Sequence, residues 1–327
     1  MVAQEAFAAA SSTYDPQSFN VLLHRQPFHV DTLLQLSEYY RATRQVEAST
    51  HLLHRALHVL EAAFHPSFKP WEYPCRVDPT PIPNKVLFTV LFRHVQTTGK
   101  SGCHRAAFEV SKLLLQCAPV EDPMRALFCV DFYGMQARQF VRVARIATAS
   151  AGLRIPGFLL PNLAYSTALA LFHCERGDAG DEGLAPPDGD TATTALLKAL
   201  LMYPQCLIPL VEFCGLNAST TGTGTVGPPG VPTVPASHCT WGTVLTHPLF
   251  SGVDFDVRCG WPVVAWSPQL THFPHTQSDD LERMASVFVT RHLSLWKQSA
   301  ALVWLWGTAT LATRAFDAWS VAPPATE

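Results

Sequence analysis

The sequence predicts an all-α protein whose helices pair into repeated hairpins. From Val30 onward, apolar residues recur three and four positions apart, the spacing that places them on one face of an α-helix. The apolar–polar alternation of a β-strand does not persist anywhere along the chain. Of the 327 residues, 48% are hydrophobic and 15% are charged, which excludes intrinsic disorder over most of the length.

The first predicted hairpin joins a helix at residues 30–41 to a helix at residues 45–64. Asp31 is placed to cap the first turn of the first helix. Pro66 ends the second helix, because proline cannot supply the next helical N–H. We expect six apolar residues of this hairpin to be buried together: Leu33, Leu36, Tyr40, Leu53, Leu57 and Leu60.

The spacing inside this hairpin matches a tetratricopeptide repeat, in which small residues at the helix crossing let two backbones approach. Ser37, Ser49 and Ala56 are the small residues here, and Ala107 is the crossing residue of a second predicted unit at residues 85–118. Since three stacked hairpins are about the minimum for a stable solenoid, the sequence predicts a tetratricopeptide-like helical-repeat solenoid. The third predicted unit has Leu127, Val130 and Gly134 on its first helix. Phe140 and Val143 lie on its second helix.

Further helices are predicted at residues 162–173 and 193–203, which form a fourth, less regular pair, and at residues 279–296 and 300–319. The last two are expected to close the solenoid, because an end repeat needs a cap. The acidic, Gly- and Pro-rich stretch 177–190 is expected to be a mobile loop. The predicted organisation is an N-terminal arm at 1–27, helical repeats at 28–214, a Gly/Thr/Pro-rich linker or insert at 215–240, and an irregular segment with C-terminal capping helices at 241–327.

Cysteine usage and hydropathy indicate an intracellular, non-membrane protein. The nine cysteines contain no close C-x-x-C pair, which suits reduced thiols in the cytosol or nucleus. The uncharged stretch 299–313 is shorter than the roughly 20 residues that a membrane-spanning helix needs. The N-terminus does not resemble a signal peptide. We therefore expect a cytoplasmic protein, with the nucleus as a second location, and without disulfides or membrane spans.

Catalytic motifs are missing from the sequence. It contains no phosphate-binding glycine loop, nucleophile elbow or H-E-x-x-H string, so we expect no enzyme, no cofactor and no small-molecule substrate. Two sets of residues resemble metal ligands. The first lies on one helix, where packing and exposure explain it better: His51, His54 and His58. The second lacks the compact ligand pairs of structural zinc sites: Cys239, Cys259, His272 and His275.

The candidate partner-binding residues are Arg138, Arg142 and Arg145, which recur four and three positions apart on the third hairpin. The net charge of −3 excludes a generic polyanion binder, but residues 31–154 hold 15 Lys and Arg against 10 Asp and Glu. An acidic partner or a phosphate backbone is therefore expected to meet this half. A solvated helix face is the preferred explanation of the arginines, because charge stripes are ordinary on exposed helices. The next surface to consider comprises Trp296, Trp304 and Trp306.

Four strings resemble the transcription factor 25 family, also called ribosome quality control complex subunit one. They are FHVDTLLQLSEYYR, HRALHVLEAAFHPSF, CHRAAFEVSKLLLQCAPVEDP and RHLSLWK, in that order. The resemblance spans residues 28–316 and implies a non-catalytic scaffold. Its implied partners are the large ribosomal subunit, the listerin-type ubiquitin ligase, ubiquitin and a hexameric unfoldase. Because family members usually carry a long N-terminal region, the resemblance also implies a truncated chain or a partial gene model.

Three functions follow as hypotheses. The leading one is a non-catalytic scaffold of the ribosome-associated quality control complex, which supports ubiquitination and extraction of stalled nascent chains on large ribosomal subunits. The alternative is a nuclear transcriptional repressor or cofactor, an older view of the same family. The third is a metal-dependent enzyme, which depends only on the two metal-ligand sets.

Overall fold

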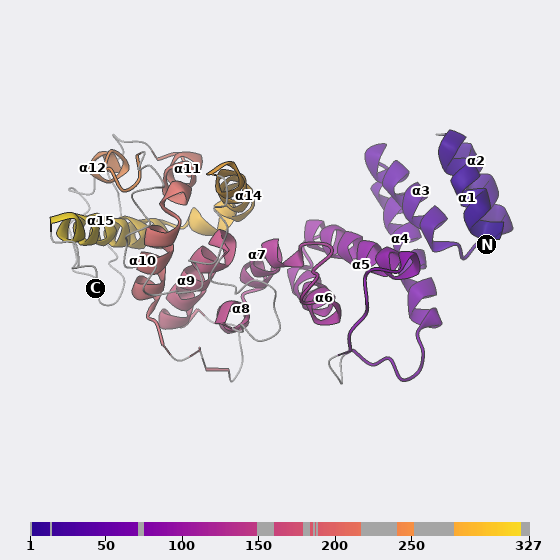
Figure 1. The fold of residues 1–327 in the computed structure, drawn as a ribbon, viewed down its shortest axis with the longest axis horizontal. Coiled ribbons are helices and arrows are strands. Elements are labelled where there is room, and N and C mark those ends of the chain that lie inside the picture. Colours follow the sequence, from indigo (N-terminus) through magenta and orange to yellow (C-terminus); the bar gives the residue numbers. More distant parts are fainter. Residues whose placement is uncertain are drawn as a thin grey trace, which may run out of the picture. The chain divides into compact units, whose positions relative to one another are not determined.

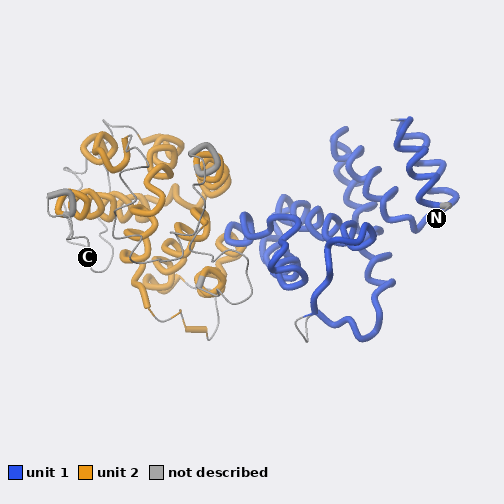
Figure 2. Tube along the Cα trace, viewed as in Figure 1, with its two compact units in different colours: residues 1–133 blue, residues 134–327 orange. Residues whose placement is uncertain are grey.

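The computed structural model describes residues 2–13, 15–70, 75–148, 160–178, 184–185, 187, 189–216, 241–251 and 278–321. All regular secondary structure in these residues is helical, which confirms the all-α prediction (Figure 1). The chain divides into two compact units, Met1–Tyr133 and Gly134–Glu327 (Figure 2). Most of the predicted linker, from residue 217 to 240, lies outside the described residues.

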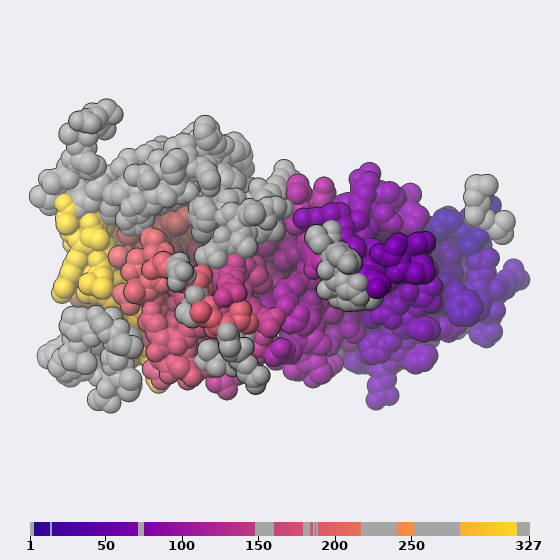
Figure 3. Space-filling view, turned by 90° about the horizontal axis from the view of Figure 1, so that it is seen from below, coloured from indigo at the N-terminus to yellow at the C-terminus, as the bar shows by residue number. Residues whose placement is uncertain are grey.

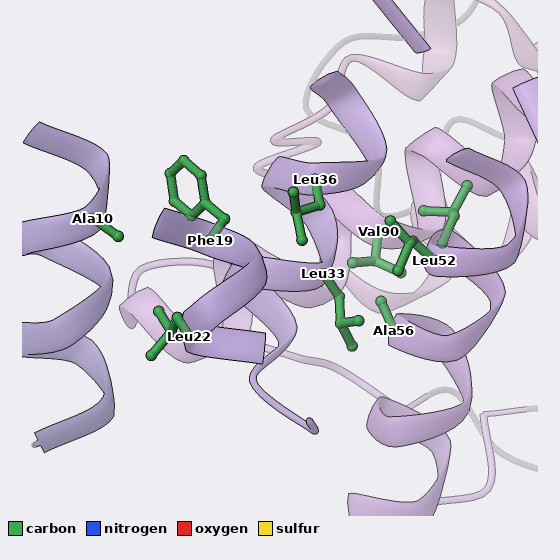
Figure 4. Close-up of a cluster of buried hydrophobic side chains, with 9 residues drawn as sticks. Ala10, Phe19, Leu22, Leu33, Leu36, Leu52, Ala56 and Val90 are labelled. Atoms are coloured by element: carbon green, nitrogen blue, oxygen red, sulfur yellow. The ribbon is translucent and has the colours of Figure 1, made fainter. Parts of the chain in front are cut away.

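The residues expected to form an N-terminal arm fold into two helices, α1 (Val2–Thr13) and α2 (Pro16–Arg25). Asp15 caps α2, since its carboxylate accepts a hydrogen bond from the Gln17 N–H at 3.0 Å. Phe19 and Leu22 of α2 are buried with Ala10 of α1 in the same cluster as the first hairpin. These helices are therefore part of the first unit's core (Figure 4).

The first predicted hairpin is present as α3 (Val30–Ala42) and α4 (Val46–Ala63). Its cap differs from the prediction, because His29, not Asp31, accepts the Thr32 N–H. Three of the six predicted core residues are buried, and the other three are partly buried against the same cluster. The buried three are Leu33, Leu36 and Leu53, and the partly buried three are Tyr40, Leu57 and Leu60.

Two serines occupy the crossing of α3 and α4. The Ser37 hydroxyl donates to the Ser49 carbonyl at 2.9 Å, and the Ser49 hydroxyl donates to the Ser37 carbonyl at 2.8 Å. Both residues are buried, so this exchange satisfies two hydroxyls that burial would otherwise leave without partners. The small side chains allow the close helix approach that the repeat pattern predicts.

The second hairpin consists of α5 (Ile82–Lys100) and α6 (His104–Cys117), joined by a turn in which Gly102 has φ +81°. Ala107, the predicted crossing residue, is fully buried. Glu38 of α3 links the two hairpins at the surface, because its carboxylate pairs with Arg41 at 2.6 Å and with Arg93 of α5 at 2.5 Å.

Gly99 of α5 lies directly against the ring of Tyr133, so that a Cβ at this position would overlap the ring. Alanine normally stabilises a helix interior relative to glycine by about 1 kcal/mol. Here we expect Gly99→Ala to lower the free energy of unfolding by about 1–3 kcal/mol, because overpacking outweighs helix propensity. Chemical denaturation checks this. Adding Tyr133→Leu should recover part of the loss, whereas a stabilised Gly99→Ala chain would contradict the close contact.

The third hairpin is less regular than the sequence predicts. Leu127 lies in a single 3₁₀ turn, η1 (Ala126–Phe128), and α7 (Val130–Gln136) has only seven residues before α8 (Phe140–Thr148). Buried Asp122 caps this turn, since its carboxylate accepts the N–H groups of Ala126 and Leu127 at 2.8 and 3.1 Å. The division between the two units falls within α7.

The second unit is built around the buried helix α9 (Pro161–Glu175), which packs against α8, α10 (Ala192–Met202) and α14 (Ser278–Trp296). It continues through η3 (Pro204–Cys206), α11 (Leu207–Phe213) and α12 (Trp241–Leu245), then α15 (Ser299–Val321). These ranges confirm the helices predicted at 162–173, 193–203, 279–296 and 300–319. The salmon surface of α10 adjoins the yellow surface of α15 in Figure 3, in agreement with their packing.

Aromatic side chains fill this second core. Trp304 stacks on Phe172 with ring centroids 4.5 Å apart, and its indole N–H donates to the Thr193 hydroxyl at 3.2 Å. Trp296 lies parallel to Trp304 at 6.3 Å. Both tryptophans are fully buried, so the expectation that they form a surface is wrong, and only Trp306 is partly exposed. Their role is to hold α9, α10, α14 and α15 together.

Candidate partner-binding surface

The three candidate arginines do not share one helix face. Arg142 and Arg145 lie on α8, but Arg138 lies in the turn between α7 and α8, with φ +55°. The turn is closed by hydrogen bonds from the Arg138 and Gln139 N–H groups to the carbonyls of Met135 and Gly134. The three arginines therefore keep a helical spacing in the sequence although α8 begins after the first of them, and the sequence does not indicate this helix start.

Two of these arginines donate hydrogen bonds to main-chain carbonyls in the described residues that follow α9. Arg138 donates from Nη2 to the Asp178 carbonyl at 3.2 Å, and Arg145 donates from Nη2 to the Ala185 carbonyl at 2.9 Å. Arg142 is half-buried and makes contacts of its own within the fold. The arginines thus serve the folded chain itself, and Arg138 and Arg145 remain exposed beside the loop.

A histidine that the sequence did not single out lies next to Arg138. His173, at the end of α9, stacks on Phe140 with ring centroids 4.5 Å apart. Its Nδ1 is 3.2 Å from a carboxylate oxygen of Asp178, which is also 3.5 Å from Nε of Arg176. Burial lowers the pKa of His173 despite the opposing carboxylate. The hydrogen bond from His173 lowers the pKa of Asp178.

These groups line a cavity of about 360 Å³ in the second unit. Its far wall comes from the junction of α14 and α15, about 120 residues further along the chain. Gln136 donates from Nε2 to the Ser294 hydroxyl at 3.1 Å across one side of the cavity. The polar lining residues are Gln136, Arg138, His173, Asp178, Ser294 and Gln298. The apolar lining residues are Met135, Phe140 and Leu295.

The three histidines on α4 are exposed and do not converge. Across the described residues, no group of three or more His, Cys, Asp or Glu is placed to hold a metal ion. His54 instead packs edge-on against His94 of α5, with ring centroids 5.5 Å apart. The other set of metal-ligand candidates lies outside the described residues: Cys239, Cys259, His272 and His275.

Acidification is expected to destabilise the first unit through His94. Burial and the neighbouring His54 lower the pKa of His94, and Glu61 opposes them. Because this pKa lies below the unfolded value of about 6.5, the fold favours the neutral ring. Its contribution to stability is complete above that pH and is lost as the pH falls through it.

The measurement is the drop in melting temperature between about pH 7.5 and pH 5.5, which should be smaller in His94→Gln than in the unchanged chain. His58→Gln alters an exposed residue of α4 and should keep the full drop. An undiminished drop in His94→Gln would show that other groups carry the acid sensitivity.

Among the described helices, none is by itself long and apolar enough to cross a membrane. The pair formed by Ala192–Met202 and Pro204–Phe213 reaches that length and hydropathy only when taken together, across a bend of 95°.

A protein-family model described as "Transcriptional repressor TCF25" matches residues 1–322. The chain belongs to this family. The TCF25 family assignment agrees with the resemblance of the four sequence strings, which lie within the matched range. It establishes the family across both compact units.

The proteins to which this chain is similar carry two kinds of name. The Mus musculus protein named ribosome quality control complex subunit TCF25 is 29% identical over 303 residues, which cover 93% of this chain and 39% of that protein. The Schizosaccharomyces pombe ribosome quality control complex subunit 1 is 34% identical over 222 residues, which cover 67% of this chain and 31% of that protein. An Ampulloclitocybe clavipes protein named probable transcription factor claV is 29% identical over 315 residues, which cover 93% of this chain and 35% of that protein.

The chain therefore spans less than two fifths of the length of these curated relatives. No solved structure matches it significantly.

Proposed function

We propose that this chain is a non-catalytic scaffold of the ribosome-associated quality control complex. The observation that carries the proposal is the similarity to proteins named as subunits of that complex in an animal and a fungus. A Dictyostelium discoideum protein with the same kind of name is 30% identical over 239 residues. The similarity covers both helical units, so the proposal concerns the described fold as a whole.

The helical hairpins support a scaffold role. In the first unit, α3 packs against α4 and α5 against α6, while α4 packs against α5. Small crossing residues such as Ser37, Ser49 and Ala107 are buried at these contacts. We propose on this basis that the hairpins stack as a tetratricopeptide-like solenoid, an architecture whose extended surface binds other proteins.

The scaffold would act through its partners. Those proposed are the large ribosomal subunit, the listerin-type ubiquitin ligase, ubiquitin and the hexameric unfoldase. By holding them together, the chain would support ubiquitination and extraction of stalled nascent chains. Bringing several binding partners onto one surface raises their effective concentration without new chemistry at the scaffold.

The test is a sucrose gradient of cells in which ribosomes stall. We expect the chain to sediment with large ribosomal subunits after stalling and to leave those fractions when stalling is relieved. A chain that stays at the top of the gradient while stalled large subunits accumulate would refute the proposal. The Leu53→Ala variant, which is expected to weaken the first unit, tests whether binding needs that fold.

The second candidate function is a nuclear transcriptional repressor or cofactor. Two observations favour it: the description of the family model and the name of the Ampulloclitocybe clavipes relative. Steady association with chromatin in fractionated nuclei, together with absence from ribosomal fractions after stalling, would select this function over the scaffold.

A further inference from the structure

The cavity between the α7–α8 turn and the α14–α15 junction contains polar groups whose hydrogen-bonding capacity is not used within the described residues. A guanidinium has five N–H donors, and Arg138 uses one of them, for the Asp178 carbonyl. The Gln298 side-chain amide makes no hydrogen bond to a described residue. The Gln136 amide contributes only its N–H group, to Ser294, so its oxygen is still available.

Among the described residues, the charged groups that line the cavity or lie next to it leave an excess of one positive charge. Asp178 is the one acid among the described lining residues, and it is shared between Arg176 and His173. Burial lowers the pKa of His173, which disfavours a charge on this ring. The guanidinium groups of Arg138 and Arg176 carry a fixed positive charge, because arginine is not deprotonated in proteins. A singly charged anion therefore fits better than a phosphate, whose second charge would meet the Asp178 carboxylate.

The rest of the lining selects a ligand with an apolar stem. Met135, Phe140 and Leu295 form the apolar wall beside the polar groups. The volume of about 360 Å³ is at the lower end of the range for ligand pockets, which suits one or two side chains rather than a large cofactor. A planar carboxylate can take two parallel N–H bonds from a guanidinium, and this geometry gives both strength and direction.

We propose that this cavity binds one carboxylate of a partner polypeptide, with Arg138 pairing to the carboxylate and Gln298 donating an amide N–H. The apolar wall takes the aliphatic stem next to that carboxylate. The carboxylate comes from a glutamate side chain or from a chain's C-terminus, which share the same chemistry. The inference deepens the scaffold function proposed above, because it names the chemistry of one contact.

The probes are four short ligands, titrated into the full chain up to about 5 mM and followed by NMR of glutamine side-chain amides. The first, Ac-Ala-Glu-Ala-NH2, offers only a side-chain carboxylate, and the second, Ac-Ala-Ala-Leu-OH, offers only a C-terminal one. The third, Ac-Ala-Gln-Ala-NH2, has no charge, and the fourth is inorganic phosphate. We expect saturable shifts with at least one carboxylate peptide, and binding at least tenfold weaker for the uncharged peptide.

Variants of the chain distinguish binding in this cavity from nonspecific attraction of the peptide carboxylate to any exposed arginine. Arg138→Asn removes the guanidinium, and asparagine readily adopts the left-handed backbone of this position, where φ is +55°. This variant should bind the carboxylate peptide at least tenfold more weakly. Arg145→Gln removes another exposed arginine, which does not line the cavity, and it should change binding less than twofold. Gln298→Ala should weaken binding severalfold without altering the α7–α8 turn, which keeps the test decisive if Arg138→Asn fails to fold.

Three outcomes would overturn the inference: no saturable binding of either carboxylate peptide, equal losses in Arg145→Gln and Arg138→Asn, or phosphate binding as tightly as the carboxylates. The last outcome would indicate a general anion site, as for nucleic acid. The sedimentation test is independent of these results. A chain that sediments with large ribosomal subunits but does not bind the peptides would keep the proposed scaffold function and refute the carboxylate contact alone.

Discussion

Trp304→Ala is expected to lower the free energy of unfolding of the second unit by about 3–5 kcal/mol. Trp304 is fully buried, stacks on Phe172 and donates its indole N–H to Thr193, so truncation removes packing on α9 and a hydrogen bond to α10. The truncation also removes the packing between Trp304 and Trp296, whose rings lie parallel with centroids 6.3 Å apart. Urea denaturation followed by far-UV circular dichroism measures the loss.

Trp306 provides the matched control for this prediction. It lies on the same helix as Trp304 but is partly exposed, so Trp306→Ala should cost clearly less. Equal losses for the two variants would contradict the prediction, because Trp304 is fully buried and stacks on Phe172, whereas Trp306 is partly exposed.

Leu53→Ala is expected to cost the first unit about 2–5 kcal/mol. Leu53 is 2% exposed, in the cluster that joins α2, α3, α4 and α5, so its truncation leaves a void among several elements. The loss should appear in the transition of the first unit. Of the eight tryptophans, Trp71 lies in the first unit and the other seven lie in the second. Tryptophan fluorescence should therefore change little, while circular dichroism should report the loss of stability of the first unit.

Val46→Ala is the control for Leu53→Ala. Val46 is 63% exposed at the start of the same helix, and its truncation should change the stability by less than about 0.5 kcal/mol. A Leu53→Ala chain as stable as the Val46→Ala chain would show that the apolar stripe of α4 was misassigned.

Long amphipathic helices were predictable from the sequence because their period is repeated over several turns. The bounds of α3, α4, α9 and α14 lie within a few residues of the predicted ranges. Helices α1 and α2 were missed because both are short, with 12 and 10 residues, and α1 bears only Val2 and Phe7 as large apolar residues. The capping role of His29 was missed as well, because histidine is an uncommon N-cap residue and Asp31 offered a more typical one.

The candidate site was predictable only in part. Arg138 was identified, but its left-handed backbone is not signalled by any glycine or asparagine, so the sequence placed it on a helix. The rest of the cavity depends on tertiary folding, which brings Ser294 and Gln298 to residues more than 100 positions earlier in the chain. Tryptophan burial was misjudged for the same reason, since a single helix does not show what covers it.

Arg138 and Arg145 contact the segment after α9 at two main-chain positions, and this limits how the sequence of that segment can vary. Both contacts end on main-chain carbonyls, of Asp178 and Ala185, which every residue type provides. These two hydrogen bonds therefore do not depend on which side chains stand at positions 178 and 185, although the Asp178 carboxylate also pairs with His173 and Arg176. An insertion or deletion between the two carbonyls, by contrast, would change the length of chain that must span from one arginine to the other. Selection on this loop should accordingly act on its length more than on its composition.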